Sequence, residues 1–444
     1  MIFMQESALK RMDTKKQDIV EITTKDAVYK GKVMPSPVKD TIVLKLDSGY
    51  NIGIPKKTIK KSVILKKQKP IRKVMYKQKK QQKNTKTITV IHTGGTISSV
   101  VDYETGGVVS RYTPEDLLSM FPELRGIANI KTVFLRNMWS QDMRFSHYNL
   151  ILKEVEKQLK SGVDGIIITH GTDTLGYTAA ALSFAIEGLN NPVLLVAAQR
   201  SSDRGSSDAA ANLISAANFI TKADFAGVAI CMHEETSDKT CVILPATKTR
   251  KFHSSRRDAF KPVNTSPIAR VYYKSGTVEF LTGHYLKKDQ KRKLQIKSFK
   301  ENLKIGLFRF HPNMFAEQLL FYKNYHGLVI EASGLGHLST TKIDEKTAEN
   351  QKIFNALTLL VKKGVFVVLA PQTIFGRLNL NVYENQRKLK EIGVLGDGSD
   401  MLSETTFIKL AWLLSNYKKE EISTLLMTNL RGELNERLQE EMFL

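Results

Sequence analysis

From residue 87 onward, short apolar segments alternate with segments of helical pattern, and this alternation restricts the chain to a mostly parallel α/β sheet. One of the helical segments ends at Gly162, a residue type common at helix C-termini. Strands that are apolar on both faces and separated by helices are typical of a doubly wound sheet. The sequence therefore predicts an α/β domain over residues 87–290. Its expected strands are TITVIHTGG, KTVFLRN, GIIITHGTD, NPVLLVAAQ and GVAICMH, and its expected helices are TPEDLLSMFPEL, SHYNLILKEVEKQLKSG, TAAALSFAIEGL and SSDAAANLISAANFI.

The alternation restarts near residue 290 and predicts a second, smaller α/β domain over residues 291–417. A polar tail, residues 418–444, follows and is expected to be helical in part. A chain of 444 residues is too long for one compact core, because domains typically run to about 100–200 residues. The expected strands of this second domain are KIGLFRF, HGLVIEA and GVFVVLAP, and its expected helices are KTAENQKIFNALTLLVKKG and SETTFIKLAWLLSNY.

Residues 1–65 predict a separate small β-barrel. Short segments of alternating apolar and polar residues occur from residue 18 to residue 65, interrupted by glycine and proline. The next segment, residues 66–86, is polar and rich in lysine, and like charges extend such a linker. Its composition fits either a solvated hinge or a segment that contacts an RNA backbone.

The net charge of +23 is informative about the kind of binding partner and says little about the fold. Such a charge favours contact with polyanions such as nucleic acid, and adaptation to a salty or hot cytoplasm is the alternative. Cys231 and Cys241 form no CxxC pair and have no zinc-like histidine spacing, so we expect two reduced core residues in a cytoplasmic protein. No apolar run approaches the roughly 20 residues that span a bilayer, and we expect no signal peptide.

Two polar segments directly follow predicted strands. TVIHTGGTISS places residues 93–96 after the first strand, and IIITHGTDT places residues 169–174 after a later one. Open α/β sheets bind ligands beyond the carboxyl ends of their strands, and glycine lets the backbone turn sharply and approach a ligand. We therefore expect the hydroxyl groups of both segments and the carboxylate of Asp173 to line one crevice. The chain contains neither GxGxxG nor GxxxxGK[ST], which argues against a phosphate cradle.

A threonine hydroxyl in this crevice requires a base, because it is a weak nucleophile by itself. A lysine can serve if burial lowers its pKa, and a carboxylate can hold that lysine in place. The stretch TKTRKFHSSRRDAFKPVN contains two candidates, Lys248 and Lys251, which composition does not separate. Arg256 and Arg257 in the same stretch are interpreted either as partner contacts or as exposed loop charge.

The histidines near these segments are not expected to carry chemistry. His170 is predicted to pack within the turn of the second segment. His233 and His253 are placed in polar loops.

TGGTI (93–97) and THGTDT (169–174) resemble the two signature motifs of the bacterial-type L-asparaginase and glutaminase family. SQDM (140–143), the AAQRSSD…SSDAAANL region (197–213) and AFKPVN (259–264) extend the resemblance. The resemblance implies that Thr96 is the nucleophile and that a second group supports it. Lys251 is preferred over Lys248 in that group because of its spacing to Phe260. The implied catalytic residues are Thr96, Thr172, Asp173 and Lys251.

The same resemblance implies how a substrate is held. Ser140, Gln141 and Asp173 would bind the α-carboxylate and α-ammonium groups of a free amino acid. The backbone N–H groups of Thr172 and Ala198 would stabilise the oxyanion, which is a large contribution in acyl transfer. Neither a metal nor a nucleotide is expected in this chain.

The amino-terminal segment narrows the resemblance. GKVMPS…DTIVLKLDSGYNIGI resembles the amino-terminal module of the GatD family, which belongs to the archaeal glutamyl-tRNA(Gln) amidotransferase, and MHEETSD, RKFHSSRRDAF and ASGLGHL extend this likeness along residues 18–435. It implies a glutaminase subunit that passes ammonia to a partner, GatE. GatE would use ATP and Mg to convert glutamyl-tRNA(Gln) into glutaminyl-tRNA(Gln). A homodimer within a heterotetramer is implied as well.

Two other functions are weighed against this one. The alternative is a stand-alone L-asparaginase or glutaminase, which would share the catalytic residues but would need neither the barrel nor the RKFHSSRRDAF loop. A non-catalytic scaffold that binds tRNA through the basic linker is the third possibility. The complete set of Thr96, Thr172, Asp173 and Lys251 argues against it.

Overall fold

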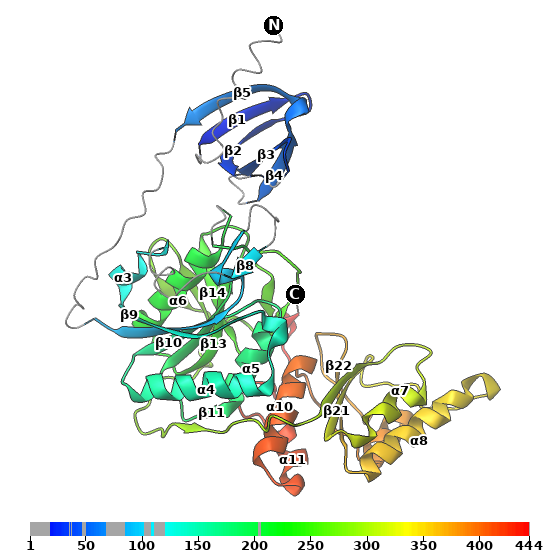
Figure 1. Ribbon diagram of the computed structural model, residues 1–444. Coiled ribbons are helices and arrows are strands. Elements are labelled where there is room, and N and C mark those ends of the chain that lie inside the picture. The colour runs from blue at the N-terminus through cyan, green and yellow to red at the C-terminus, as the bar shows by residue number, and fades with distance from the viewer. Residues whose placement is uncertain are drawn as a thin grey trace.

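The computed structural model describes residues 18–34, 36, 38–46, 50–67, 85–101, 108–110, 120–202 and 206–443. An antiparallel sheet at the N-terminus, a large α/β domain and a smaller α/β domain follow one another along the chain (Figure 1). Most of the predicted basic linker, residues 66–86, and most of the helix expected over residues 113–124 lie outside the described residues. Within the described ranges, no helix is both long enough and apolar enough to cross a membrane.

The N-terminal module is a curved, five-stranded antiparallel sheet with the order β4-β3-β2-β1-β5 (Figure 1). Alternate residues of β1 are buried, because a strand points successive side chains to opposite faces. Among the described residues, the buried core cluster of this module contains six apolar side chains and is thin. The strands are β1 (Ile19–Thr24), β2 (Val28–Met34), β3 (Thr41–Leu46), β4 (Asn51–Pro55) and β5 (Ile59–Lys66).

The large domain is built on an eight-stranded sheet with the order β18-β17-β14-β13-β12-β10-β6-β9. The five strands from β13 to β9 in this order are parallel, and β14, β17 and β18 are antiparallel additions. This confirms the predicted doubly wound sheet. The strands are β6 (Thr87–Gly94), β9 (Asn129–Met138), β10 (Gly165–Thr169), β12 (Pro192–Val196), β13 (Gly227–His233), β14 (Thr240–Pro245), β17 (Ala269–Tyr272) and β18 (Val278–Phe280).

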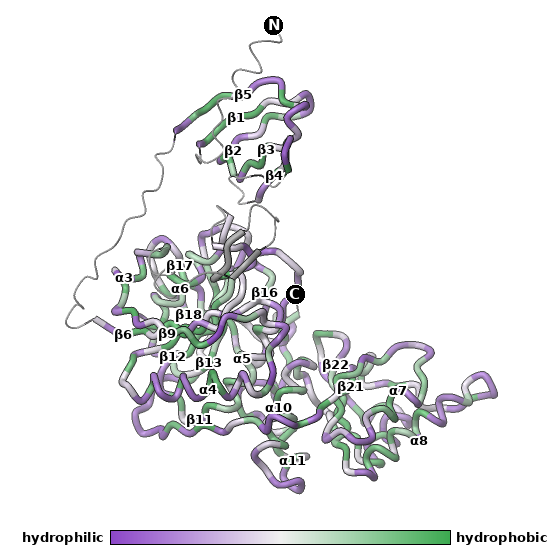
Figure 2. Tube along the Cα trace, viewed as in Figure 1, coloured by the Kyte–Doolittle hydropathy of each residue, from purple (hydrophilic) through white to green (hydrophobic). Residues whose placement is uncertain are grey.

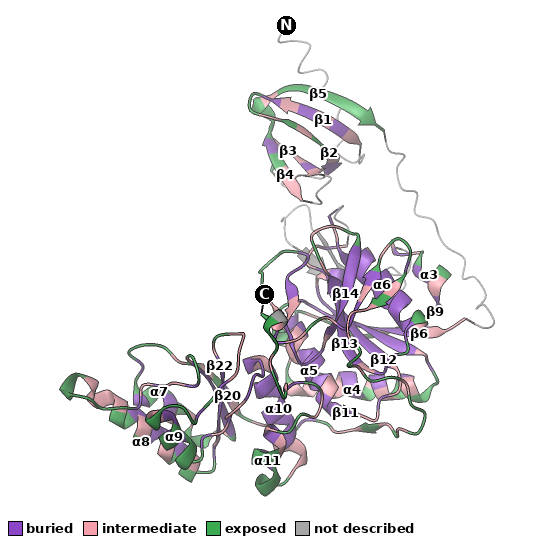
Figure 3. Ribbon diagram, turned by 180° about the vertical axis from the view of Figure 1, so that it is seen from behind, coloured by how far each residue is buried: buried purple, intermediate pink, exposed green. Residues whose placement is uncertain are grey.

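Helices cover both faces of this sheet. Alternate residues of β10 belong to two different cores: Ile166 and Ile168 pack with α4 and α5, whereas Ile167 packs with α3 and α6. The central strands are therefore buried on both sides (Figure 3), and α4 combines hydrophilic residues with apolar ones (Figure 2), of which Ile151, Leu152 and Val155 are buried. The helices are α3 (Leu124–Ile127), α4 (Phe145–Lys160), α5 (Leu175–Ala185) and α6 (Ala209–Lys222).

The smaller domain contains a parallel three-stranded sheet with the order β20-β21-β22. Its last long helix, α10, also packs on the large domain, where the rings of Trp412 and Phe184 stack with centroids 5.7 Å apart. The strands are β20 (Ile305–Arg309), β21 (Gly327–Ala332) and β22 (Phe366–Pro371), and the helices are α7 (Ala316–Leu320), α8 (Ala348–Lys362), α9 (Glu384–Glu391), α10 (Ser403–Asn416) and α11 (Lys419–Leu426).

Short strand pairs complete the fold. The pair β15 and β16 forms a hairpin within the polar, basic stretch that contains both lysine candidates, and it carries Lys251 at the end of its first strand. The pairs are β7 (Ser99–Val101) with β8 (Val108–Ser110), β11 (Ile186–Glu187) with β19 (Gln295–Ile296), and β15 (Thr249–Lys251) with β16 (Phe260–Pro262).

Candidate active site

The two motifs predicted to form a crevice leave the sheet from neighbouring parallel strands. TGGTI follows β6 and THGTDT follows β10, and the register places His92 opposite Thr169. The Thr93 hydroxyl donates to the Thr169 carbonyl at 2.7 Å, and Nδ1 of His92 lies 2.8 Å from the Thr169 hydroxyl. Because parallel neighbours end at the same edge, the two segments lie side by side at the carboxyl edge of the sheet.

Glycine is required where these segments touch. Gly95 has a φ of +84°, and a Cβ added to it would lie 2.5 Å from the backbone nitrogen of Gly171. A Cβ added to Gly171 would lie 2.7 Å from Oγ of Ser140. No side chain fits at such distances, so the backbone of Gly95 lies directly against that of Gly171, and the backbone of Gly171 lies directly against the Ser140 side chain.

Lys251 binds both neighbouring residues of the second motif. Its Nζ donates to the Thr172 hydroxyl at 2.9 Å and to Oδ1 of Asp173 at 2.8 Å. The Lys251 side chain is 16% exposed, whereas that of Asp173 is 64% exposed and remains open to a ligand. A lysine fixed by a hydroxyl and a carboxylate can relay a proton to or from a reacting group in this crevice.

Lys248, the other lysine candidate, lies elsewhere. Its Nζ forms a 2.7 Å ion pair with Oδ2 of Asp400, and the two side chains are 2% and 0% exposed. Burial lowers the pKa of Lys248, and the Asp400 carboxylate opposes that shift. Asp400 precedes α10, so this pair joins the two α/β domains and does not face the motifs.

Thr96 begins a short 3-10 helix, η2 (Thr96–Ser98), directly after Gly95. It is partly buried, and its neighbour Gly95 is the residue that contacts Gly171. Its location is therefore compatible with attack on a substrate held by the second motif. Its role as nucleophile stays a prediction.

Ser140 and Gln141 open another short 3-10 helix, η3 (Ser140–Asp142), which follows β9. The Ser140 hydroxyl accepts from the Asp173 backbone N–H at 3.2 Å, and its carbonyl accepts from the Thr174 hydroxyl at 2.7 Å. Gln141 is exposed. The structure thus brings Ser140 to Asp173, as the proposed amino-acid pocket requires, and leaves Gln141 beside it.

Ala198 lies just beyond β12, the strand next to β10 on the side away from β6. It is fully buried. The N–H of His170 donates to the Val196 carbonyl at 3.0 Å, which ties the ends of β10 and β12 together. The Ala198 segment therefore belongs to the same edge of the sheet as Thr172.

His170 packs in the turn, as predicted, and shapes it. Nδ1 lies 2.7 Å from the Gly171 carbonyl and Nε2 lies 2.9 Å from the Thr178 hydroxyl. Complete burial lowers the pKa of His170 to about 4, although the Gly171 bond opposes the shift. The ring is therefore neutral at pH 7, with Nδ1–H donating to Gly171.

Two predictions about polar residues are wrong. His233 is the last residue of β13 and is fully buried, so it does not lie in a polar loop. Arg257 is 4% exposed and forms a 2.6 Å ion pair with Asp238, so it is neither an exposed loop charge nor available to a partner. The misleading signal was local composition, because both residues stand beside polar sequence. Cys231 and Cys241 are buried and unpaired, as expected.

Comparisons with known proteins agree with this geometry. The family description "Asparaginase, N-terminal" matches residues 87–285, "Glutaminase/Asparaginase C-terminal domain" matches residues 304–426, and "GatD N-terminal domain" matches residues 14–64. The thermostable L-asparaginase from Thermococcus kodakarensis has a similar structure, with a TM-score of 0.67 and 28% identity, over 79% of this chain and 100% of that protein. L-asparaginase I from Vibrio cholerae shares the fold with a TM-score of 0.67 and 24% identity, over 79% of this chain and 99% of that one.

The fold and the meeting of the two threonine motifs define an asparaginase-type protein. Curated relatives narrow the class. The glutamyl-tRNA(Gln) amidotransferase GatD protein from Pyrococcus furiosus is 43% identical over 424 residues, covering 94% of this chain and 93% of the relative. The corresponding protein from Methanococcus maripaludis is 40% identical over 429 residues, covering 96% and 99%. The chain belongs to the GatD family of the glutamyl-tRNA(Gln) amidotransferase.

Proposed function

We propose that this chain hydrolyses glutamine and supplies the ammonia that converts glutamyl-tRNA(Gln) into glutaminyl-tRNA(Gln). The observation that carries the proposal is the contact of Lys251 with both Thr172 and Asp173, next to the Gly95–Gly171 approach that adjoins Thr96. Membership of the GatD family supports glutamine as the ammonia donor and glutamyl-tRNA(Gln) as the acceptor.

In the proposed mechanism, Ser140, Gln141 and Asp173 hold the α-carboxylate and α-ammonium groups of glutamine. Asp173 supplies the anion that the ammonium requires, and its exposed carboxylate supports this role. Hydrogen bonds from the backbone N–H groups of Thr172 and Ala198 stabilise the oxyanion that forms on the side-chain amide.

The chemistry proceeds in two steps. Oγ of Thr96 attacks the amide carbon, and the Thr96 proton passes through Lys251 and Thr172 to the leaving nitrogen. The C–N bond then breaks, ammonia departs, and a glutamyl ester remains on Thr96. Water adds to that ester with the same residues accepting its proton, which releases glutamate and restores the Thr96 hydroxyl.

We propose that the synthetic half-reaction belongs to a partner, GatE of the same amidotransferase. GatE would bind ATP and Mg and activate the glutamyl-tRNA, so that this chain itself needs no cofactor. A homodimer of this chain within a heterotetramer, located in the cytoplasm, is part of the same proposal. The family to which the chain belongs supports the partner, and its N-terminal module is shared with that family.

A stand-alone L-asparaginase or glutaminase is the second candidate. Structural similarity to the Thermococcus L-asparaginase supports a hydrolytic site of the same type in this chain. For the stand-alone function, however, the 28% identity to that enzyme is weaker support than the 43% identity to a GatD protein is for the amidotransferase function. The two functions differ in whether hydrolysis depends on the partner and on tRNA.

The test is a glutaminase assay on the co-purified complex and on the chain alone, with and without glutamyl-tRNA(Gln). The proposal expects turnover that rises when both GatE and glutamyl-tRNA are present. Equal turnover by the isolated chain, with asparagine accepted as well as glutamine, would favour the stand-alone enzyme. Thr172→Val in the same assay should reduce turnover by orders of magnitude with the fold intact, and near-normal turnover would contradict the mechanism.

A further inference from the structure

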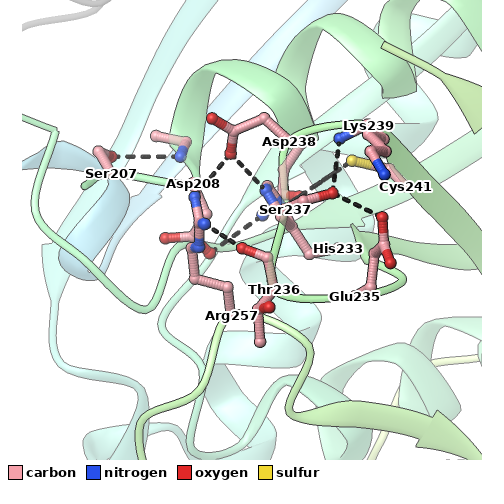
Figure 4. A network of polar contacts seen from close by, with 12 residues as sticks. Ser207, Asp208, His233, Glu235, Thr236, Ser237, Asp238, Lys239, Cys241 and Arg257 are labelled. Carbon is pink, nitrogen blue, oxygen red and sulfur yellow. Dashed lines mark hydrogen bonds and ion pairs between the residues drawn. The ribbon is translucent and has the colours of Figure 1, made fainter. Parts of the chain in front are cut away.

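A buried charged network at the end of β13 takes no part in the mechanism described so far (Figure 4). At its centre is His233, which is 0% exposed. Nδ1 of His233 lies 2.6 Å from Oδ1 of Asn212, and Nε2 lies 3.1 Å from Oδ1 of Asp238. The network extends from His233 toward two different loops of the candidate site.

Hydrogen bonding fixes the charge of His233. The amide nitrogen of Asn212 donates to the Ala197 carbonyl at 2.9 Å and to Oδ2 of Asp208 at 3.3 Å, so the Asn212 atom facing His233 is an oxygen. Both ring nitrogens of His233 thus face acceptors and both donate, which only the protonated ring can do. Burial by itself lowers the pKa of His233, but the hydrogen bond to Asp238 and other contacts raise this pKa to about 10.

The inner arm of the network holds the Ala198 segment. Asp208 is fully buried, and its two carboxylate oxygens accept from the backbone N–H groups of Gln199 and Arg200 at 3.0 Å. Asp208 stands at the N-cap position of α6, yet its carboxylate makes no capping bond there. With Asn212 on the Ala197 carbonyl, this arm fixes the backbone on both sides of Ala198.

The outer arm holds the hairpin that carries Lys251. Oδ1 of Asp238 also accepts from Nη1 of Arg257 at 2.6 Å, and Arg257 donates to the Thr236 carbonyl as well. Arg257 lies in the turn between β15 and β16, where the Phe252 N–H donates to the Ala259 carbonyl at 2.7 Å and Lys251 pairs with Phe260. These bonds tie Arg257 to the hairpin whose first strand carries Lys251.

We infer that His233 is a positioning residue for the hydrolysis, which holds the Ala198 segment and the Lys251 hairpin in one fixed relative geometry. The inference rests on the proposed function, because it concerns how that site is assembled. A fully buried cation costs more to fold than apolar packing of the same volume, and such groups can select one geometry over others. Here the two groups joined by the cation are the proposed oxyanion donor and the proposed proton carrier.

The N-terminal module lies close to groups of both arms of the network. The charge of Lys45, on β3, acts on Asp238 and Arg257. The guanidinium of Arg200 lies 5.7 Å from the ring centroid of Tyr50, which directly precedes β4 in the same hairpin. Residues of both arms thus interact with the N-terminal module, so the network is not confined to internal packing of the sheet.

The experiment compares kcat and KM for glutamine in the complete complex carrying His233→Gln, with the exposed histidine variant His284→Gln as the matched control. Misplacement of a reacting group by about 1 Å lowers turnover by about 100-fold, so His233→Gln should reduce kcat by about 10- to 100-fold and change KM by less than about 3-fold. His284→Gln should leave both parameters unchanged. A purely structural role would reduce stability and active fraction without lowering kcat per folded site.

Thr172→Val, measured alongside, separates the two claims. If Thr172→Val abolishes turnover while folded His233→Gln keeps a normal kcat, the positioning role is overturned and the proposed function stands. If Thr172→Val itself retains turnover, the proposed mechanism fails, and if the parent complex shows no glutamine turnover, the proposed function fails. Should His233→Gln not fold, Asp238→Asn, which preserves side-chain shape, must show the same loss of kcat, and a normal kcat in that variant overturns the inference.

Discussion

Lys248 and Lys251 stand close together in the same segment, and each pairs with an aspartate at almost the same distance, 2.7 Å and 2.8 Å. Their surroundings differ. Lys248 and Asp400 are buried between two domains, whereas Asp173, the partner of Lys251, is largely exposed. The length of an ion pair thus says little about its role. Burial decides whether the pair holds the fold together or is available to a substrate.

The difference has an energetic consequence. Removing one member of a buried pair leaves an uncompensated charge and costs about 3–5 kcal/mol, whereas an exposed pair contributes about 0–1 kcal/mol. The junction around Lys248 is also tied by other bonds, since the Thr405 hydroxyl donates to the Thr247 carbonyl at 2.7 Å and Asn435 donates to Asp400 at 2.9 Å. We therefore expect opposite effects of substitution at these two neighbouring lysines.

The largest effect is expected for Lys251→Met. Removal of a general acid–base group lowers turnover by about 10²- to 10⁴-fold, so kcat for glutamine should fall within that range. The free energy of unfolding should change by less than about 1 kcal/mol, because Asp173 is exposed and remains solvated without its partner. A glutamine turnover assay gives kcat, and denaturant unfolding of the same preparation gives the free energy of unfolding. If Lys251→Met lowered the stability of the fold but left kcat per folded molecule unchanged, the roles assigned to the two lysines would have to be reversed.

Lys248→Met should produce the converse result. The free energy of unfolding is expected to fall by about 3–5 kcal/mol, because Asp400 is left charged and buried. Turnover per folded molecule should remain within about 3-fold of the parent, since Lys248 does not face the motifs. The double variant Lys248→Met with Asp400→Asn should regain part of the stability. No gain in the double variant would show that the ion pair is not the source of the loss.

A smaller, pH-dependent effect on the free energy of unfolding is expected for Asp238→Asn. Hydrogen bonding to His233 lowers the pKa of Asp238, with Arg257 and Lys45 contributing in the same direction and burial opposing it. A carboxylate with a depressed pKa stabilises the fold above its ordinary pKa of 3.8, and this contribution is lost as the pH falls through the lower, folded value. With Asp238 half exposed, the loss in Asp238→Asn at pH 7 should be about 1 kcal/mol after solvent screening.

Unfolding curves of both proteins from pH 7 down to about pH 3 measure this difference. The difference between the two free energies of unfolding should shrink toward the acid end, because the folded pKa of Asp238 lies below 3.8. A constant difference across the whole range would mean that Asp238 acts by packing and not by its charge.

Much of the fold follows from local pattern. Apolar segments such as GIIIT, buried at every position in β10, have to be strands with helices on both sides, and their carboxyl ends locate the crevice. The glycines beside Thr96 and Thr172 mark sites of close approach in the sequence itself. Both inferences depend on short stretches of sequence, because an apolar run or a pair of glycines constrains the local backbone without help from distant residues.

The remaining features depend on residues that are distant in sequence. Nothing in the sequence near Lys248 reveals that Asp400 is its partner. Local composition therefore could not decide which of the two lysines, Lys248 or Lys251, is the catalytic candidate. His233 follows an apolar strand but precedes the polar sequence EETSD, and the loop interpretation failed because the strand extends to include it. Arg257 appeared exposed in RKFHSSRRDAF because Asp238, which neutralises it, belongs to a different loop.

The central claim is that a threonine of the first motif attacks glutamine with help from Lys251 and the second motif. Rapid quenching of the active complex during glutamine turnover, followed by peptide mass spectrometry, tests it most directly. The account predicts a glutamyl ester on Thr96, in the peptide that contains TGGTI. An ester found on Thr172 in place of Thr96 would contradict it.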